Sequence, residues 1–329
     1  MEVSQQKVHV IFGNGPIGSA AARCLLEKEQ TVRIASRSGS RPPVLFDELT
    51  PDQRSRLSFI AADARNTDAV LRATADASHI YHCVNVLYQD WRKMLPPIHE
   101  NLVEAAVRSG AVLAVVENLY MYARGVDVID ESTPVVPPTR KGLLRQRLHE
   151  TLEKAAETRG LRWTAVRGSD YYGPGASLQS FFGTRFFLDP LFRGGRPMSV
   201  GNIDQPHTFT YVGDFGSALA MAALDERALG KAWIVPNDRA VTQRELAGIF
   251  FRESGRTARL NTMGRGMIAV AGLFSPLVRE LQEMLYQKEE PYVVDGSRFV
   301  STFGFSPTRL EEGVRKTLAW YKAVRDREA

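Results

Sequence analysis

Residues 8–18 read Val8-His9-Val10-Ile11-Phe12-Gly13-Asn14-Gly15-Pro16-Ile17-Gly18, an apolar run followed by a G-x-G-x-x-G pattern. The apolar, alanine-rich run 20–26 comes directly after it. Gly13 permits a tight turn, Gly15 lets the backbone approach a pyrophosphate, and Gly18 lets a helix pack closely on the strand. The helix N-terminus then faces the phosphates. This order of strand, turn and helix predicts a dinucleotide-binding fold in which residues 13–18, including Asn14, Pro16 and Ile17, hold the cofactor.

The second apolar run, residues 31–35, ends without an acidic residue. In NAD-binding chains an Asp or Glu about 20 residues past the glycines usually accepts a hydrogen bond from the ribose 2′-hydroxyl. Here the chain continues with Ser36, Arg37 and Ser38. The two hydroxyls can donate to a 2′-phosphate, and Arg37 can hold it with two hydrogen bonds, with Arg41 as a candidate second cation. The sequence therefore predicts NADP(H), and the alternative for Arg37 is a solvated turn.

The overall composition is that of an ordinary globular protein. The chain has 329 residues, 44% of them hydrophobic, and its 42 basic and 37 acidic residues give a net charge of +5 without a basic block. We therefore expect no nucleic-acid partner. Only Cys24 and Cys83 are present, so a disulfide framework and a cysteine-ligated metal are not expected. This usage of cysteine favours a cytoplasmic location.

The apolar stretches are short. The first seven residues are polar, so no secretory signal is expected. The longest apolar stretch, residues 267–274, falls below the roughly 20 residues of a membrane span. We expect it to form a buried helix, and we expect a small-molecule substrate, no membrane partner and a homodimer as the candidate assembly.

Apolar runs of strand length alternate with segments of helical period through the first half. The runs are 8–12, 31–35, 57–61, 79–83, 112–116 and 163–167, and the helical segments include 66–75, 98–107 and 142–158. This alternation predicts an α/β fold of the Rossmann type, a doubly wound parallel sheet. We expect a cofactor domain over residues 1–167, to which 207–235 return, and a smaller, mostly helical substrate domain over 168–329. Capping boxes are expected at Thr242-x-x-Glu245 and Thr308-x-x-Glu311.

Polar residues also follow the third and fourth runs. Asp63 and Ala64 come after residues 57–61, and Val84 and Asn85 follow 79–83. Because ligands bind at the carboxyl edge of an open α/β sheet, we expect all four beside the cofactor, with Asp63 reaching the adenine amino group. The alternative for Asp63 is a helix N-cap.

On these residues the chain resembles the extended short-chain dehydrogenase/reductase superfamily, also called the NAD-dependent epimerase/dehydratase family. The resemblance covers almost the whole length. Its markers are the glycines at 13–18, Asp63, the run 166–175 (VRGSDYYGPG), the run 208–214 (TFTYVGD), and the C-terminal segments 291–295 and 303–308. It implies the fold and the nicotinamide cofactor, and it implies that Ser169 and Tyr171, in the turn 168–171, contact the nicotinamide.

The chain departs from that family at the helix after the fifth strand. Most members have Ser or Thr at the end of this strand and Tyr-x-x-x-Lys on the helix, where the tyrosine exchanges a proton and the lysine holds the ribose. Here Lys141 stands in the tyrosine's place and Arg145 in the lysine's. This Lys-x-x-x-Arg is similar to the helix of the isoflavone-reductase-like group, in which a lysine is the catalytic acid/base.

A lysine at this place suits reduction. A carbonyl that receives a hydride develops negative charge on oxygen, which an ammonium group stabilises and protonates. Lys141 is therefore the expected proton donor and a cofactor ligand, against the alternative of a solvated helix face. Asn118 can donate to the same oxygen, and Tyr120 and Tyr122 are candidate substitutes for the absent tyrosine, although strand-end tyrosines commonly serve packing. The spacing of the histidines predicts no metal site.

The leading interpretation is an NADPH-dependent oxidoreductase that reduces a carbonyl or conjugated double bond of a small, largely apolar substrate. Phe181, Phe182, Phe186 and Phe187 are available for its pocket, although part of this set must form the core. One alternative is an NADP-dependent epimerase or dehydratase of a sugar-type substrate. The other is a catalytically silent NADP(H)-sensing regulator.

Overall fold

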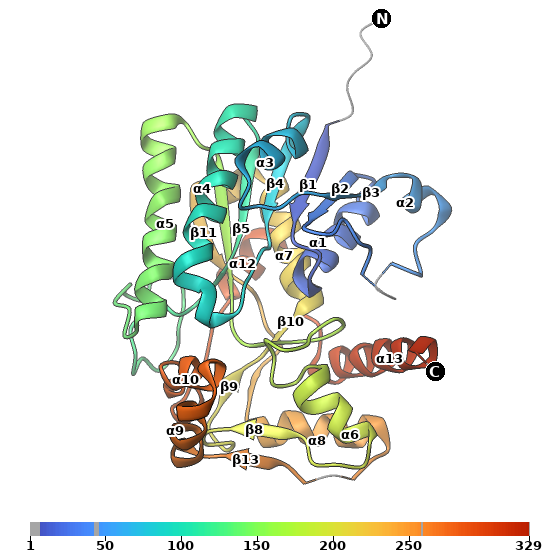
Figure 1. Cartoon of the computed structure of the whole chain (residues 1–329), viewed down its shortest axis with the longest axis vertical. Coiled ribbons are helices and arrows are strands. Elements are labelled where there is room, and N and C mark those ends of the chain that lie inside the picture. Colours follow the sequence, from blue (N-terminus) through green and yellow to red (C-terminus); the bar gives the residue numbers. More distant parts are fainter. Residues whose placement is uncertain (1–6, 43–45, 258, 329) are drawn as a thin grey trace, which may run out of the picture.

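The centre of the molecule is a parallel sheet of seven strands in the order β11-β6-β5-β4-β1-β2-β3 (Figure 1). The computed structural model describes residues 7–42, 46–257 and 259–328. The strands are β1 (Val8–Phe12), β2 (Thr31–Ser36), β3 (Leu57–Ala61), β4 (Ala77–His82), β5 (Val112–Asn118), β6 (Trp163–Gly168) and β11 (Lys231–Ile234). All six runs expected as strands lie in this sheet, and the doubly wound α/β fold is confirmed. The strand order reverses between β1 and β4, which is where such sheets bind ligands.

Helices cover both faces of the sheet. One face carries α1 (Pro16–Glu27), α7 (Val212–Leu224) and α12 (Ser297–Phe303), whose apolar side chains share a core with β1 and β2. The other face carries α3 (Thr67–Ala73), α4 (Trp91–Ser109) and α5 (Arg140–Arg159). The short helix α2 (Pro51–Ser55) precedes β3. Because the central strands are covered on both sides, they are almost continuously apolar.

The C-terminal region forms a smaller helical layer below the sheet (Figure 1). Its helices are η2 (Thr184–Leu188), α6 (Asp189–Phe192), α8 (Gln243–Ser254), α9 (Arg265–Phe274), α10 (Pro276–Gln282), α11 (Tyr286–Glu289) and α13 (Leu310–Glu328). Three short strand pairs accompany them: β7 (Tyr171–Tyr172) with β10 (Thr210–Tyr211), β8 (Met198–Val200) with β13 (Asn261–Met263), and β9 (His207–Thr208) with β12 (Ala240–Val241). Phe182, Phe187 and Phe250 build an aromatic core here.

Helix starts follow the expected capping chemistry at one of two sites. The Thr242 hydroxyl accepts from the Glu245 N–H at 3.0 Å and the Glu245 carboxylate accepts from the Thr242 N–H, which confirms that capping box. The box expected at Thr308 is wrong, because the Thr308 hydroxyl and N–H both donate to Asp214. The N-cap of α3 is Asn66, whose side chain accepts from Ala69. Asp63 therefore does not cap that helix.

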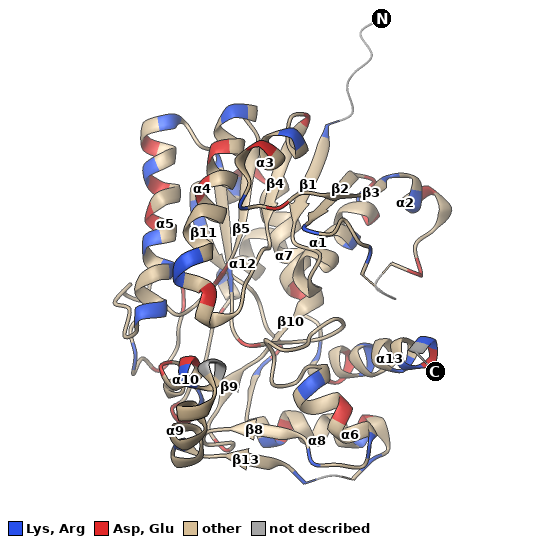
Figure 2. Ribbon diagram, viewed as in Figure 1, with Lys and Arg blue, Asp and Glu red and all other residues tan. Residues whose placement is uncertain are grey.

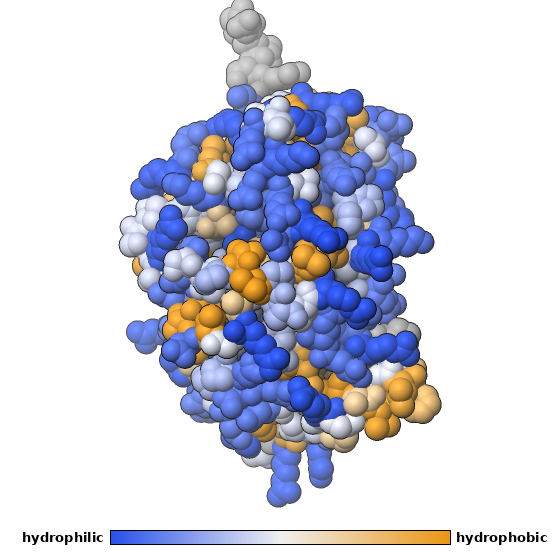
Figure 3. Space-filling view, turned by 90° about the vertical axis from the view of Figure 1, so that its left-hand side faces the viewer, coloured by the Kyte–Doolittle hydropathy of each residue, from blue (hydrophilic) through white to orange (hydrophobic). Residues whose placement is uncertain are grey.

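The apolar stretch 267–274 is helical but not buried, contrary to expectation. In α9 the exposed fractions are 53% for Met267, 60% for Val270, 70% for Leu273 and 85% for Phe274. Figure 3 views the side that carries α5, α9 and α10, and shows separate hydrophobic patches on a mostly hydrophilic surface. Among the described helices, none combines the length and hydropathy of a membrane span.

Basic and acidic side chains are mixed over the helices. Figure 2 shows both signs alternating along α5, which faces solvent on its outer side. The arrangement matches the even spread of charge along the chain.

Candidate active site

A cavity of about 610 Å³ lies at the carboxyl edge of the sheet. Its glycine-rich half is lined by residues from the ends of β1, β2 and β3. Its aromatic half is lined from β5, β6 and the helical layer by Tyr88, Trp91, Tyr120, Arg145, Asp170, Tyr171, Phe181, Phe186 and Tyr292. The two halves together offer an elongated site for a dinucleotide and a second molecule.

The glycine-rich turn is closely packed on one side and open on the other. Gly13 has φ +110°, and an added Cβ would lie 2.7 Å from the Cys83 carbonyl oxygen. A Cβ at Gly18 would lie 2.1 Å from the Gly13 oxygen, which explains why the helix needs glycine there. A Cβ at Gly15 would meet no protein atom within 4 Å, although Gly15 lines the cavity. Gly15 thus leaves room for a pyrophosphate at the start of α1.

The far end of the glycine-rich half carries cationic groups. Ser36, Arg37, Asp63, Ala64 and Arg65 line the cavity, whereas Ser38 does not. Arg37 is exposed and makes no hydrogen bond or ion pair with the described residues. The Arg65 guanidinium donates to Asp63 at 2.5 Å, and this hydrogen bond lowers the pKa of the Asp63 carboxyl. The charge of Arg37 therefore remains available to a ligand.

Arg41 and the two serines bond locally. The Arg41 guanidinium donates to the Phe46 carbonyl at 2.7 Å. The Ser36 hydroxyl accepts from the Gly39 N–H at 3.0 Å, and the Ser38 and Ser40 hydroxyls lie 2.7 Å apart. Arg37 is thus the side chain of this turn that is best placed for a phosphate.

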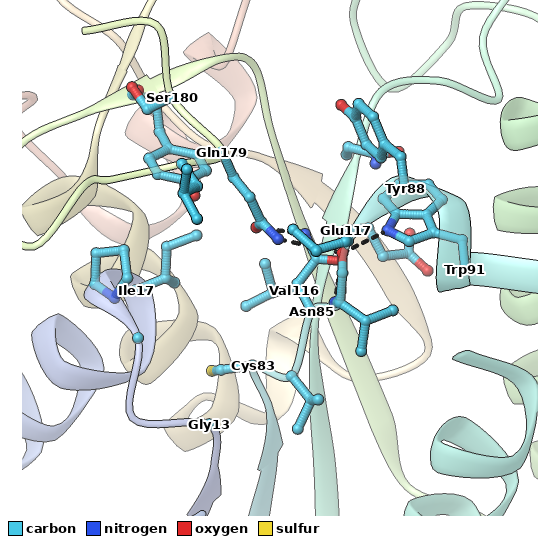
Figure 4. A pocket seen from close by; sticks show the side chains of 18 of the residues that line it. Gly13, Ile17, Cys83, Asn85, Tyr88, Trp91, Val116, Glu117, Gln179 and Ser180 are labelled. Carbon is cyan, nitrogen blue, oxygen red and sulfur yellow. Dashed lines mark hydrogen bonds between the residues drawn. The ribbon is translucent and has the colours of Figure 1, made fainter. Parts of the chain in front are cut away.

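The middle of the cavity is crossed by a loop from the helical layer. Val84 and Asn85 line it after β4, and the Asn85 amide donates to Gln179 at 2.9 Å. Gln179 in turn donates to the Val86 carbonyl at 3.2 Å, and Figure 4 shows it lying between Ile17 and Trp91. Gln179 thus joins the loop of the helical layer to the end of β4 within the cavity.

Ser169, just after β6, and Tyr171, in β7, line the cavity, and their expected contact with the nicotinamide stays a prediction. The Ser169 hydroxyl is buried and has no hydrogen-bond partner among the described residues. An unpaired buried hydroxyl is a group that a ligand can satisfy. Together with the space at Gly15, it fits a dinucleotide in this cleft.

Lys141 lies outside the cavity lining. Lys141 is the second residue of α5, and its buried ammonium forms ion pairs with Glu280 and, at 3.1 Å, with Glu283. The Lys141 backbone N–H also donates to Glu283 at 2.7 Å. The carboxylates of Glu280, in α10, and Glu283, just after it, thus balance the charge of Lys141. The expected role of Lys141 as proton donor and cofactor ligand stays a prediction.

The other catalytic candidates divide between cavity and core. Asn118 and Tyr120 line the aromatic half, and the Asn118 side-chain oxygen accepts from the Tyr120 N–H at 3.3 Å. Tyr122 is buried outside the cavity lining, and its hydroxyl accepts from Arg167 at 2.6 Å. Arg167 also pairs with Glu117 at 2.8 Å. Tyr122 therefore belongs to a buried ionic network behind the site.

Arg145 reaches the aromatic half without a polar partner. It is only 9% exposed, and its guanidinium carbon lies 4.3 Å from the centre of the Trp91 ring. Its Nε has no hydrogen-bond partner, and no carboxylate of a described residue lies within ion-pair distance. Burial lowers its pKa. A buried cation that faces a cavity without a counter-ion is poised to receive an anionic or oxygen-rich ligand.

Asp170 supplies the opposite charge. Its carboxylate is held by the Lys288 ammonium and lies 2.9 Å from His207 Nε2. Although burial by itself raises the pKa of Asp170, the Lys288 ammonium and the hydrogen bond with His207 hold it well below its usual range. Asp170 therefore remains ionised at the floor of the aromatic half.

Sequence reasoning missed several residues that line this half. Tyr88 lies in the 3₁₀ turn η1 (Tyr88–Asp90), and Trp91 begins α4. Asp170 stands in the turn 168–171, whose neighbours were expected at the cofactor, and Tyr292 comes from the C-terminal segment. The signal for Tyr88 and Trp91 was their place a few residues past the end of β4, at the binding edge of the sheet.

The chain matches a known protein family and is similar in fold to several solved structures. The NAD-dependent epimerase/dehydratase family matches residues 9–235. Among solved structures, UDP-glucuronic acid 4-epimerase from Bacillus cereus superposes with a TM-score of 0.76 at 17% identity, covering 96% of this chain and 99% of that one. UDP-glucose 4-epimerase from Thermus thermophilus gives 0.74 at 17% identity, with 96% and 99% covered. The dTDP-glucose 4,6-dehydratase DesIV from Streptomyces venezuelae gives 0.76 at 18%, with 97% and 98% covered. The comparison with curated proteins found no match.

Proposed function

The chain belongs to the NAD-dependent epimerase/dehydratase family, and we propose that within it the protein is an NADPH-dependent reductase of a small, largely apolar carbonyl or enone compound. Family membership supports a nicotinamide dinucleotide in the cavity. When bound, the reduced nicotinamide supplies a hydride. The observation that carries the proposal is the chemistry of the aromatic half, which is rich in aromatic rings and poor in cations.

The choice of the phosphorylated cofactor depends on Arg37. The three similar structures hold NAD, so the fold alone does not select NADP. In this chain Arg37 lies at the end of β2, lines the cavity and has no polar partner among the described residues. A guanidinium at this position favours a 2′-phosphate, because it can donate two parallel hydrogen bonds to it.

The substrate class follows from the charges at the aromatic half. Among the described residues the cations that line the whole cavity are Arg37, Arg65 and Arg145. Arg65 is paired with Asp63, and Arg37 lies at the cofactor's adenosine end. A nucleotide diphosphate would thus meet Arg145 and the negative charge of Asp170, whereas an aromatic ring can stack among the cavity's own rings.

Family membership favours one alternative, an epimerase or dehydratase of a sugar-type substrate, because the similar structures include enzymes that act on UDP-sugars and a dTDP-sugar. Such chemistry begins by removing a proton from a hydroxyl and thus needs a competent base. A protein that binds NADPH and turns nothing over is the remaining alternative.

A substrate screen tests the proposal. The purified chain is mixed with NADPH and either aromatic or polyketide-like ketones and enones, or UDP- and dTDP-sugars, and loss of NADPH absorbance is followed. We expect turnover with the first set. Because an epimerase or dehydratase regenerates its cofactor and consumes no net NADPH, the nucleotide sugars are also incubated with the oxidised cofactor and their products are identified. Conversion confined to nucleotide sugars would instead establish the epimerase or dehydratase, and binding of NADPH without conversion in either set would favour the regulator.

A further inference from the structure

Two tyrosine hydroxyls meet in the aromatic half of the cavity. Tyr88 comes from η1 after β4, and Tyr120 follows the end of β5. Their hydroxyl oxygens lie 2.5 Å apart, and both residues line the cavity. Neither tyrosine is on α5, the helix that carries the family's usual tyrosine. The sheet edge thus brings together a pair of proton carriers from two separate loops.

A shared neighbour fixes the pair and places a cation beside it. The Trp91 ring packs edge-on against Tyr88 at 5.0 Å and stacks on Tyr120 at 5.9 Å. Trp91 also contacts Arg145, whose guanidinium carbon lies 4.3 Å from the ring centre. Trp91 also donates its ring N–H to the Val86 carbonyl at 3.0 Å, as Figure 4 shows. The rings therefore have little freedom, and a positive charge lies near both hydroxyls.

The lysine near the tyrosine pair already has ionic partners. The Lys141 ammonium is held by Glu280 and Glu283 and lies 5.4 Å from the centre of the Tyr88 ring. Lys141 is not among the residues that line the cavity, whereas both tyrosines are. A substrate in the cavity would meet the tyrosine hydroxyls before it met this ammonium.

We propose that Tyr88 is the proton donor of the reduction, with Tyr120 donating the hydrogen bond that stabilises the Tyr88 phenolate and Arg145 supplying the balancing charge. This inference rests on the proposed reductase function and names residues of its catalytic site. It assigns the task of the missing helix tyrosine to a different pair of elements.

Hydride and proton add to the two ends of the substrate carbonyl. The carbonyl carbon of the substrate gains a hydride, its C=O π bond breaks, and the oxygen takes the proton of the Tyr88 hydroxyl as the Tyr88 O–H bond breaks. The resulting Tyr88 phenolate accepts a hydrogen bond from Tyr120 and regains a proton from water when the product leaves. The net change is addition of a hydride and a proton to the substrate.

The electrostatics agree with this direction. Burial raises the pKa of Tyr88 to about 12, while the hydrogen bond from Tyr120 and the charge of Arg145 lower it, and Asp170 raises it. The pKa of Tyr120 lies well above its ordinary value, mainly through burial, and its bond with Tyr88 raises it further. Tyr88 is therefore the more acidic member, and at neutral pH it is protonated. This state suits an acid and gives almost no phenolate base for oxidation.

Three variants test the assignment in the full chain. Tyr88→Phe is expected to lower kcat by about 10²–10⁴-fold, the usual contribution of a general acid, with NADPH affinity within a few-fold. Tyr120→Phe keeps the acid but loses a hydrogen bond to its charged form, so kcat should fall by about 10- to 100-fold. Tyr286→Phe is the control, because Tyr286 is a neighbouring buried tyrosine outside the cavity lining, and its kcat should stay unchanged.

The matched variant Lys141→Met separates the two candidate acids. If Tyr88 is the donor, Lys141→Met keeps more turnover than Tyr88→Phe does. A loss of less than tenfold in Tyr88→Phe, combined with a loss above 10²-fold in Lys141→Met, would overturn the proposal and make Lys141 the acid. In both outcomes the reductase itself stands. Only a wild-type chain that binds NADPH without reducing any carbonyl contradicts the reductase proposal.

A readout without cofactor or substrate covers the case in which Tyr88→Phe folds poorly. In Tyr88→difluorotyrosine the phenol becomes acidic enough to titrate in the folded protein, and its phenolate absorbance gives the pKa of that one group. Adding Tyr120→Phe should raise this pKa by about 1, because the phenolate loses its hydrogen-bond donor. Adding Tyr286→Phe should leave it unchanged. An equal pKa with and without the Tyr120 hydroxyl would overturn the proposed role of Tyr120.

Discussion

The glycine-rich half and the aromatic half of the cavity are built in different ways. The first is formed by consecutive turn residues. A Cβ added at Gly18 or Gly13 would lie only 2.1 or 2.7 Å from a backbone oxygen. The second gathers side chains from positions 88 to 292 and contains a buried, unpaired Arg145. In the first half the serines bond locally and Arg37 is left for a ligand, while in the second half the buried Arg145 is left. The difference indicates that the backbone of one short segment forms the cofactor site. Residues that lie far apart in the sequence form the site of the chemistry.

Two buried arginines give the largest expected contrast in stability. Arg167 pairs with Glu117 at 2.8 Å and with Tyr122 at 2.6 Å, whereas Arg145 has Trp91 alone. Arg167→Met leaves Glu117 buried with less compensation and should lower the free energy of unfolding by about 3–5 kcal/mol. Arg145→Met removes an uncompensated charge and should change it by less than about 1 kcal/mol, because relief of desolvation offsets the lost cation–π contact. Urea unfolding measures both.

For function we expect the opposite order, in which the Arg145 substitution has the larger effect. Arg145→Met, although folded, is expected to lose about 10- to 150-fold in affinity for the ligand whose oxygen it holds, the worth of a hydrogen bond to a charged group. Calorimetric titration with NADPH, followed by steady-state kinetics with the substrate found in the screen, shows which ligand this is. An Arg145→Met protein that is destabilised as much as Arg167→Met would show that Arg145 is structural.

Arg37 and Arg41 test the far end of the glycine-rich half. Arg37→Ala should weaken NADPH binding by about 1.5–3 kcal/mol and leave NADH binding unchanged, because the charge-assisted hydrogen bonds of the guanidinium to the 2′-phosphate are lost. Arg41→Ala is the matched control, since the Arg41 guanidinium already donates to the Phe46 carbonyl. Fluorescence titration of the wild-type chain and both variants with NADPH and with NADH gives the dissociation constants. Equal affinity of the wild-type chain for NADPH and NADH would remove the basis for choosing the phosphorylated cofactor.

Two glycines compare the close packing of the glycine-rich turn with an open position on a helix. Gly18→Ala introduces a Cβ only 2.1 Å from the Gly13 oxygen, so we expect a loss of about 1–3 kcal/mol in the free energy of unfolding, the typical cost of overpacking. Gly248→Ala, in the middle of α8 with nothing within 4 Å of the added Cβ, should stabilise by about 0.5–1 kcal/mol through helix propensity. Thermal unfolding followed by circular dichroism compares them. A neutral Gly18→Ala would mean that α1 can move away from the turn.

The sequence was informative where structure is local. The strands and the glycine-rich turn were predictable because apolar runs and glycines act on their own neighbours. The partners of Lys141 were not, because Glu280 and Glu283 lie about 140 positions away and meet it only after the helical layer has folded. Periodicity likewise could not show that the apolar run 267–274 faces outward, since composition reports how apolar a helix is and not what covers it.

That outward face gives the smallest expected effect. Phe274 is 85% exposed at the end of α9, whereas Phe187 is 1% exposed in the aromatic core of the helical layer. Phe274→Ser should therefore change the free energy of unfolding by less than about 0.5 kcal/mol, as surface substitutions usually do. Phe187→Ala should cost about 3–5 kcal/mol, because it removes a buried ring and leaves a cavity. Urea unfolding at two protein concentrations measures both variants. A large, concentration-dependent loss in Phe274→Ser would show that a second copy of the chain covers α9, because only an intermolecular contact makes stability depend on concentration.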